Sequence, residues 1–138
     1  MEDCLFCKIA AKQIPADVVY EDENTLAFLD VNPRAPGHTI IIPKSHRETI
    51  LDLPEKETSS LFSAVKIVAD AVSGALHADG LNIGINHKPA GGQVVNHLHV
   101  HILPRFIGDG GTSVQGIVNN PPKDSLKEIC KKIKSFRN

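Results

Sequence analysis

The residue pattern of positions 97–103, HLHVHIL, restricts the fold of this chain more than any other stretch. Three histidines, His97, His99 and His101, alternate there with apolar residues. Because side chains alternate between the two faces of a β-strand, the pattern predicts a strand with one apolar face and one imidazole face. The apolar face has to be buried, so this strand requires a sheet with a hydrophobic core on at least one side.

The other segments supply the rest of such a sheet. Runs rich in β-branched and apolar residues predict five strands, at 17–22, 25–31, 38–43, 81–87 and 95–104. Apolar residues at three- and four-residue steps predict a long helix at roughly 55–77, and shorter helices are expected near 4–14 and 123–136. The expected fold class is α+β: a five-stranded, mostly antiparallel sheet with one long helix packed on it and short N-terminal and C-terminal helices.

Composition and charge indicate one soluble domain, 1–138, with a helical tail from about 121 to 138. The net charge of −1 gives no reason to expect a nucleic-acid or membrane partner. The stretch MEDCLFCKIA is acidic where a secretion signal would be basic, and no apolar run approaches the ~20 residues of a membrane span. We therefore expect a cytoplasmic protein.

Three imidazoles on one face suggest metal binding or phosphoryl chemistry. Alternate positions on a strand lie ~6.6 Å apart, so two histidines can ligate one ion, whereas the outer pair, ~13 Å apart, cannot. At least one histidine is then left for other work. Imidazole is largely neutral at pH 7 and can attack phosphorus, while its neighbours and the glycine-rich loop 88–93 can donate hydrogen bonds to phosphate oxygens.

The stretch HLHVHIL resembles the signature of the histidine triad (HIT) family, and the resemblance extends to residues 20–46 and 85–93. HIT proteins are nucleotide hydrolases and transferases that act at the α-phosphate. The resemblance implies that His99 attacks phosphorus and forms a nucleotidyl-histidine intermediate, that His101 contacts the phosphate or the bridging atom, and that His97 supports them. It also implies a purine nucleotide substrate and a homodimer, for which the apolar face of residues 61–75 is the expected interface.

The same resemblance implies a nucleotide pocket. Asp30 matches the position that holds the ribose hydroxyls. The positions around the base and those near the phosphate are, respectively, Phe6, Ile9, Phe28, Leu29 and Val31, and Asn86, Gly92, Gln93 and Val94. From the residues alone, core packing would equally explain the phenylalanines and Ile9, and a turn would explain Asp30 and Asn86. Val94 is a departure, because the Hint branch of the family usually has serine there, and valine cannot donate a hydrogen bond.

Cys4 and Cys7 form a CxxC pair, which supplies two of the four ligands of a structural zinc site. Two buried reduced thiols would be the simpler interpretation. The resemblance implies the other two ligands, His46 and His97, as in some prokaryotic HIT proteins, and hence a structural Zn²⁺. His38, His77 and His87 have no expected role, and Cys130 is expected to be a packed thiol in the tail helix.

Three functions follow as hypotheses. The first is hydrolysis of an adenosine phosphoramidate, an amide of AMP, through His99. The alternatives are hydrolysis of a dinucleoside polyphosphate and a purine-nucleotide-binding module with little turnover. A hydrolase that uses a catalytic zinc at the histidine row is a further possibility, which chelation would test.

Overall fold

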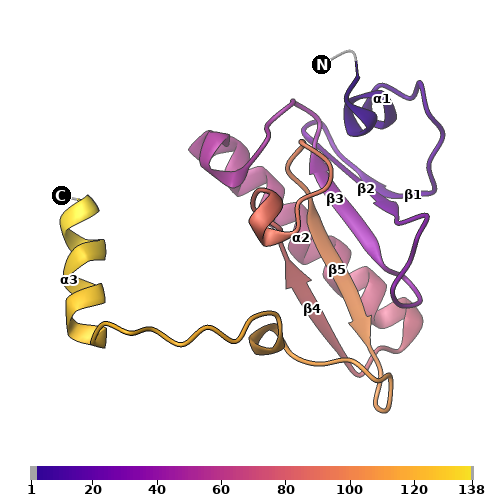
Figure 1. Cartoon of the computed structure of the whole chain (residues 1–138). Helices are drawn as coiled ribbons and strands as arrows, with labels where there is room; N and C mark the ends of the chain where they lie inside the picture. The colour runs from indigo at the N-terminus through magenta and orange to yellow at the C-terminus, as the bar shows by residue number, and fades with distance from the viewer. Residues whose placement is uncertain (1–2, 138) are drawn as a thin grey trace.

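The computed structural model describes residues 3–137, which form one antiparallel sheet with a long helix against it (Figure 1). The strand order is β1-β2-β3-β5-β4, and every neighbouring pair is antiparallel. The strands are β1 (Val18–Glu21), β2 (Thr25–Leu29), β3 (Thr39–Pro43), β4 (Gly80–Gly84) and β5 (Val100–Arg105). The α-helices are α1 (Leu5–Ala10), α2 (Glu55–Leu76) and α3 (Leu126–Arg137), and the 3-10 turns are η1 (Ile50–Asp52), η2 (Pro89–Gly91) and η3 (Val114–Gly116). The predicted fold class is confirmed.

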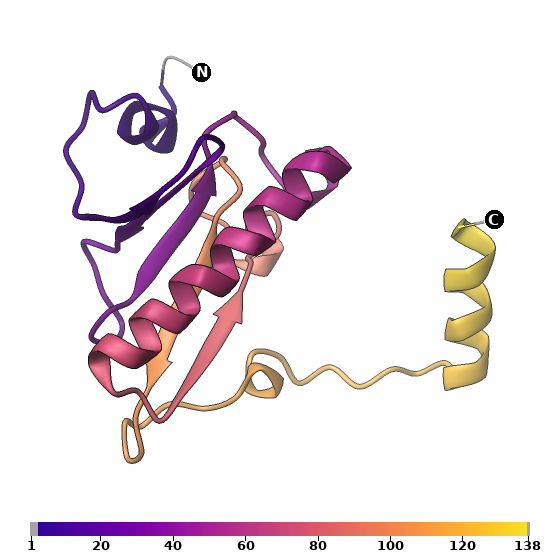
Figure 2. The ribbon, with the colours of Figure 1, turned by 180° about the vertical axis from the view of Figure 1, so that it is seen from behind.

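The sheet separates two hydrophobic clusters. Helix α2 crosses one face (Figure 2), where its apolar stripe packs on Ile41, Val100 and Ile102. The other face carries a smaller cluster to which α1 contributes Phe6 and Ile9. All five residues of β3 are buried, because this strand has a core on each side. This explains why the predicted strand 38–43 reads as a continuous apolar run.

The main apolar stripe of α2 packs on the sheet, so a homodimer interface at 61–75 would have to use other residues of this helix. Leu61, Val65 and Val68 are each at most 5% exposed, because they cover the sheet. Phe62 and Ile67 of the same helix are 41% and 51% exposed, so a homodimer interface at 61–75 stays a prediction. By length and composition α2 could also cross a membrane, but the same stripe lies in the core.

The histidine segment enters the sheet later than predicted. Only His101 lies in β5, between Ile40 of β3 and Gly84 of β4, whereas the expected strand began at residue 95. Beyond Ile41 the two strands diverge, and the Pro43 carbonyl lies 2.8 Å from the ring of His97 instead of a backbone N–H. The backbone N–H of Leu98 donates to the Arg47 carbonyl at 2.6 Å, so this segment is held by the 44–49 loop.

Candidate active site and metal centre

The imidazoles of His97, His99 and His101 lie on one side of the sheet, as the alternation predicts. The ring centroids of His99 and His101 are 5.0 Å apart, and the Phe6 ring of α1 meets both His99 and His97 edge to face, with centroid distances of 5.1 and 6.0 Å. Leu98, Val100 and Ile102 point the other way, into the cluster under α2. The two-faced strand is therefore present, although its first part is held by loop contacts.

The orientation of the His99 ring is fixed by its own neighbourhood. Its Nδ1 atom lies 2.7 Å from the backbone carbonyl of His97. A carbonyl oxygen can only accept, so Nδ1 must carry the proton of a neutral ring. The lone pair is then on Nε2, the nitrogen that is free to attack.

His38 has a role that the sequence did not suggest. Its ring is 4% exposed, and its Nε2 lies 2.9 Å from Nδ1 of His101. The backbone N–H of Arg34 donates to His38 Nδ1 at 3.1 Å, so the proton of the neutral His38 ring is on Nε2 and points at His101. His101 therefore accepts at Nδ1 and carries its own proton on Nε2. The expectation that His38 is incidental is wrong.

Burial keeps this pair of rings neutral. It lowers the pKa of His101 to about 4, with further lowering from the nearby His99 and His38 and a smaller opposing effect of Asp30. Burial also lowers the pKa of His38, and the Asp30 carboxylate partly opposes this. At pH 7 the chain of donors from Arg34 through His38 to His101 is therefore intact.

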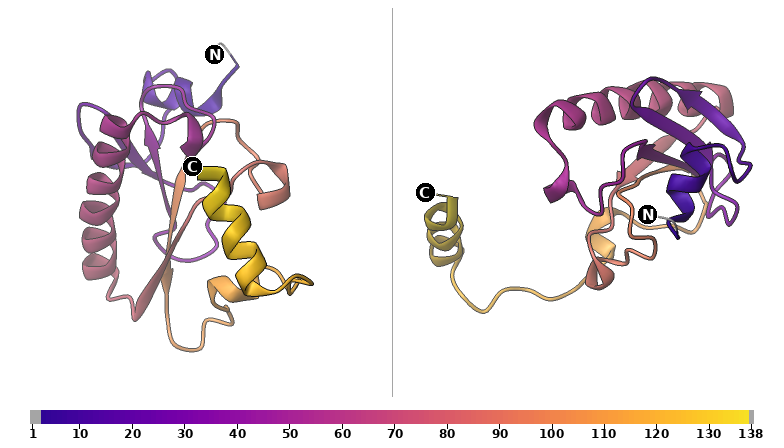
Figure 3. Two further views of the ribbon diagram at one scale, coloured as in Figure 1. Left: turned by 90° about the vertical axis from the view of Figure 1, so that its left-hand side faces the viewer. Right: turned by 90° about the horizontal axis from the view of Figure 1, so that it is seen from above.

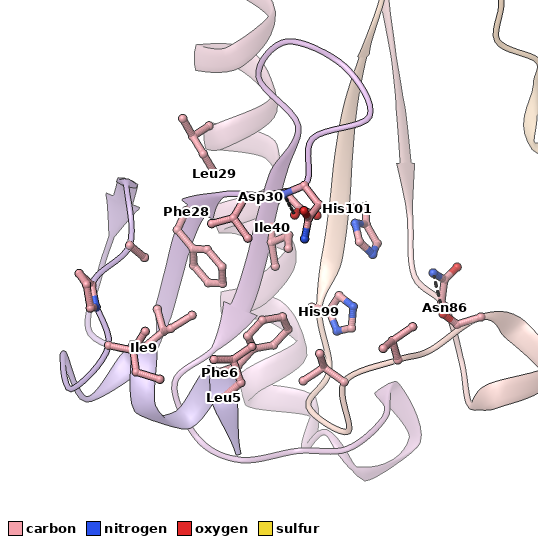
Figure 4. A pocket seen from close by; sticks show the side chains of 18 residues that line it. Leu5, Phe6, Ile9, Phe28, Leu29, Asp30, Ile40, Asn86, His99 and His101 are labelled. Atoms are coloured by element: carbon pink, nitrogen blue, oxygen red, sulfur yellow. Dashed lines mark hydrogen bonds between the residues drawn. The ribbon is translucent and has the colours of Figure 1, made fainter. Parts of the chain in front are cut away.

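A cavity of about 490 Å³ opens beside the histidines (Figure 4). Its apolar wall contains five of the expected base-contacting positions, Phe6, Ile9, Phe28, Leu29 and Val31. Asp30, Asn86, Gly92, Val94, His99 and His101 also line it. The structure adds residues that sequence reasoning missed, chiefly the 14–16 turn, Asn32, Ile40 and Val95. Their signal in the sequence is only apolar or turn character, which many loops share.

Two polar residues of the cavity wall have defined partners. One oxygen of Asp30 accepts the backbone N–H of Asn32 at 2.8 Å, and the other lies 3.5 Å from His38 Nε2. Gly92 has φ +94°, a left-handed conformation that favours glycine, and it packs against the Asn86 side chain. The Asp30 carboxylate thus faces the cavity from a fixed position.

Gln93 lies elsewhere. It is 8% exposed and does not line the cavity. Its amide nitrogen donates to the carbonyls of Glu48 and Val95, and its oxygen accepts the backbone N–H of Lys88. The side chain thus fastens the 88–95 loop to residue 48, so its contribution to the site is to shape that loop.

The side chains of Cys4, Cys7, His46 and His97 form a second, separate cluster. Their potential ligand atoms all lie within 4.8 Å of one another. Cys4 Sγ is 3.3 Å from Nδ1 of His97, and Cys7 Sγ is 3.3 Å from Nδ1 of His46. In a tetrahedral zinc site with ordinary bond lengths, sulfur and nitrogen ligands are roughly 3.5 Å apart. The four donors therefore fit Zn²⁺ with no open position.

The protonation of His97 supports this fit. Its Nε2 faces the Pro43 carbonyl at 2.8 Å, so the proton is on Nε2 and the Nδ1 lone pair faces the thiols. Burial lowers the pKa of His97 to about 4, which keeps that lone pair available. Burial and Cys4 raise the pKa of Cys7 to about 11 when no metal is bound, so a metal has to displace the thiol proton.

Asp30, His38 and His101 also lie close enough to share an ion. However, His38 and His101 are joined at 2.9 Å by an N–H···N hydrogen bond, whereas two nitrogen ligands of a tetrahedral zinc are roughly 3.4 Å apart. The hydrogen-bond chain accounts for this cluster without a metal.

The five-stranded antiparallel sheet carries a row of histidines, two of which line the cavity, so the class of protein is one whose site is built from imidazoles. A family model described as the HIT domain matches residues 11–108, and the chain belongs to the HIT family. An uncharacterised HIT-like protein of Methanocaldococcus jannaschii is 47% identical over 127 residues, which are 91% of this chain and 98% of the relative. An adenylylsulfatase of Arabidopsis thaliana is 40% identical over 103 residues, 75% of this chain and 52% of that protein.

Solved structures are similar to this chain over almost its whole length. A crystal structure of a Streptococcus mutans protein is similar with a TM-score of 0.91 and 40% identity, covering 100% of this chain and 87% of that one. A Zn-bound histidine triad family protein of Mycobacterium smegmatis is similar with a TM-score of 0.76 and 34% identity, covering 98% of both chains.

Proposed function

We propose that this protein is a nucleotide hydrolase or transferase that acts at the α-phosphate, with adenosine phosphoramidates as its preferred substrate class. The observation that supports this most directly is the tautomer of His99, whose Nε2 lone pair is left free beside the cavity. Among the relatives, the Arabidopsis adenylylsulfatase supports hydrolysis of an adenylyl conjugate, in which the bond to the α-phosphorus is broken.

The first step transfers the nucleotidyl group to the enzyme. The base lies on the apolar wall with Phe6 and Ile9, and the ribose hydroxyls donate to Asp30. The His99 Nε2 lone pair forms a bond to the α-phosphorus while the bond from phosphorus to the leaving amine breaks. The Nε2–H of His101 donates a hydrogen bond to the phosphate or to the leaving nitrogen, and that nitrogen takes up a proton from solvent as it departs.

The second step releases the product. A water molecule attacks the α-phosphorus on the side that the amine left, the bond to His99 Nε2 breaks with its electron pair returning to the nitrogen, and the proton that the water loses passes to solvent. The nucleoside monophosphate is released, and His99 regains its lone pair. His38 holds His101 in the correct tautomer through both steps.

Cys4, Cys7, His46 and His97 would hold a structural Zn²⁺. The ion would supply cross-linking and no Lewis-acid chemistry, since the four donors leave it no open position. Two of the ligands flank the start of α1, which is only six residues long and carries Phe6 and Ile9 into the cavity wall. His97 then serves the metal, and His99 and His101 serve the phosphate.

The same site would accept a dinucleoside polyphosphate, or would bind a purine nucleotide with little turnover, and these remain the alternative functions. We also infer a cytoplasmic location, a homodimer, and no nucleic-acid or membrane partner. The charge of −1 is the basis for the last two exclusions.

A fluorogenic adenosine phosphoramidate separates the hypotheses. We expect turnover by the zinc-loaded protein and a loss of at least about 1000-fold in His99→Ala, which has lost the nucleophile but retains the cavity. Intact mass spectrometry during turnover should show an AMP adduct that is missing from the variant. Absence of turnover in both proteins, with AMP still bound, would instead support a binding module.

A further inference from the structure

Asp30 lies where the cavity meets the hydrogen-bonded pair of His38 and His101. In Figure 3, α1 and α2 cover opposite sides of the sheet, and His101 faces the side of α1 because Val100 and Ile102 point towards α2. Asp30 and His101 both line the cavity, and Figure 4 shows them next to each other at one end of it. The carboxylate and the ring nitrogens of the two histidines lie within 4.8 Å of one another, so a change at the carboxylate can reach both rings.

The two oxygens of the Asp30 carboxylate have different partners. Oδ1 accepts the backbone N–H of Asn32 at 2.8 Å, a contact that closes a turn. Oδ2 lies 3.5 Å from Nε2 of His38, and within residues 3–137 it has no shorter contact with a donor. The turn therefore explains Oδ1 alone, and Oδ2 is the oxygen that can accept from a molecule in the cavity.

The single ring proton of His38 faces two acceptors. The backbone N–H of Arg34 donates to Nδ1, so the proton of the neutral ring is on Nε2. That nitrogen lies 2.9 Å from Nδ1 of His101 and 3.5 Å from Oδ2 of Asp30. His101 is the closer acceptor, but the carboxylate is charged, and hydrogen bonds to a charged group are the stronger ones. The proton is thus shared between an acceptor that fixes the tautomer of His101 and one that does not.

We propose that the ribose of the bound nucleotide controls the hydrogen-bond donor of His101 through Asp30 and His38. A ribose hydroxyl that donates to Oδ2 satisfies that oxygen, so the His38 proton is left to His101. His101 then accepts at Nδ1 and keeps its own proton on Nε2, where it can donate to the substrate. Asp30 is therefore a positioning residue that selects ribonucleotides in the chemical step as well as in binding. This inference rests on the proposed function, which places the ribose at Asp30.

Two phosphoramidates with the same amine, one of adenosine and one of 2′,3′-dideoxyadenosine, test this in the zinc-loaded protein. We expect the dideoxy substrate to raise KM and also to lower kcat by about 3- to 10-fold, because the hydrogen bond from His38 to His101 is weakened. In His38→Phe the kcat difference should fall below about twofold, since the path from the ribose to His101 is cut. The KM difference should remain there, because Asp30 still contacts the ribose.

Ile9→Val is the matched control, because it shortens a side chain of the cavity wall on α1 and leaves Asp30 and His38 in place. This variant should keep the full kcat difference between the two substrates. A kcat difference of the same size in wild type and His38→Phe would overturn the proposal. The ribose would then act by holding the reacting phosphate in place, as remote parts of a substrate commonly do.

The tautomer of His101 can also be measured without turnover. In wild-type protein labelled with nitrogen-15 in its histidines, the chemical shifts of the two ring nitrogens show which one carries the proton. We expect a single Nε2–H tautomer of His101 in the AMP complex and an averaged signal with 2′,3′-dideoxy-AMP, which has the same base and phosphate. Identical His101 signals in the two complexes would overturn the proposal. Absence of turnover with both substrates would contradict the proposed function instead, and these ring signals would then decide the coupling alone.

Discussion

His97 and His99 are two residues apart in the sequence, and both rings are almost completely buried, but their free nitrogens face different sites. At His97 the Pro43 carbonyl accepts from Nε2, so the Nδ1 lone pair faces the two thiols. At His99 the carbonyl of His97 accepts from Nδ1, so the Nε2 lone pair remains for the cavity. In the proposed function, the choice of partner carbonyl, rather than the residue type, makes His97 a metal ligand and His99 a nucleophile.

At His101 the position of the ring proton is fixed in a third way. Its Nδ1 accepts from a second histidine, and its Nε2 keeps a proton that it can donate. One imidazole row thus provides a closed end with four mutually facing donors and an open end with one lone pair and one N–H. The following variants act on one end at a time, in order of decreasing expected effect.

Loss of the closed end should have the largest effect. Cys7→Ala removes one zinc ligand, and we expect loss of zinc by elemental mass spectrometry and a fall of at least about 3 kcal/mol in the free energy of unfolding in urea. Nucleotide binding should weaken as well, because α1 carries Phe6 into the cavity wall. Cys130→Ala is the matched control, because Cys130 is exposed on α3, contrary to the expectation of a packed thiol, and its loss should change neither quantity.

Removal of the metal by a chelator distinguishes a catalytic zinc from a structural one. If chelation stopped turnover at once while the circular dichroism spectrum and unfolding curve stayed unchanged, the zinc would be catalytic. The division between the closed and open ends would then be wrong.

The open end should be sensitive to His38. His38→Phe keeps an aromatic ring but removes the donor to His101, and we expect kcat/KM to fall by about 10- to 100-fold, the effect of losing one buried hydrogen bond. The effect should be on kcat, with AMP affinity almost unchanged, because His38 does not line the base cavity. His38→Gln, which can donate from its amide, should recover part of kcat. Equal losses in both variants would indicate a packing role only.

Much of the fold follows from periodicity in the sequence. The alternation at 97–102 and the spacing of apolar residues in 55–77 are local patterns with one structural solution each, and both elements are present. The start of β5 at Val100 instead of residue 95 could not be predicted, because it depends on contacts of residues 93–98 with the distant 43–48 segment. Element ends are set by such long-range partners.

In the candidate site, too, local motifs could be predicted from the sequence and long-range contacts could not. The CxxC pair and the triad are local motifs, and the family resemblance supplied His46. His38 has no motif of its own, and only the antiparallel pairing of β3 with β5 brings it next to His101, 63 positions away. The exposed position of α3 could not be predicted either, because an amphipathic pattern indicates an apolar face without indicating what that face packs on.

Protonation of His101 at low pH should lower the free energy of unfolding. The pKa of His101, about 4, lies below that of an exposed histidine, so the unfolded chain takes up a proton between about pH 6.5 and 4 that the folded chain does not. Stability is complete above this window and is lost as the pH falls through it, by roughly 2–3 kcal/mol from this residue. Urea unfolding at pH 7 and pH 5 should therefore show a smaller difference in His101→Gln than in wild type. An equal difference in the two proteins would show that His101 is not a source of the acid sensitivity.

The smallest effect is expected from Val94, which is 91% exposed where it borders the cavity near the open end. Val94→Ser supplies a hydroxyl that can donate to the phosphate or the leaving group, a contribution of about 0.5–1.5 kcal/mol. Phosphoramidate turnover should rise a few-fold, while the free energy of unfolding should change by less than about 0.5 kcal/mol, as for most surface substitutions. Val94→Ala reduces the side chain without adding a donor, so an equal rise there would assign the gain to reduced bulk. A rise confined to a dinucleoside polyphosphate substrate would favour the alternative activity, because the new donor would then assist a phosphate leaving group and not an amine.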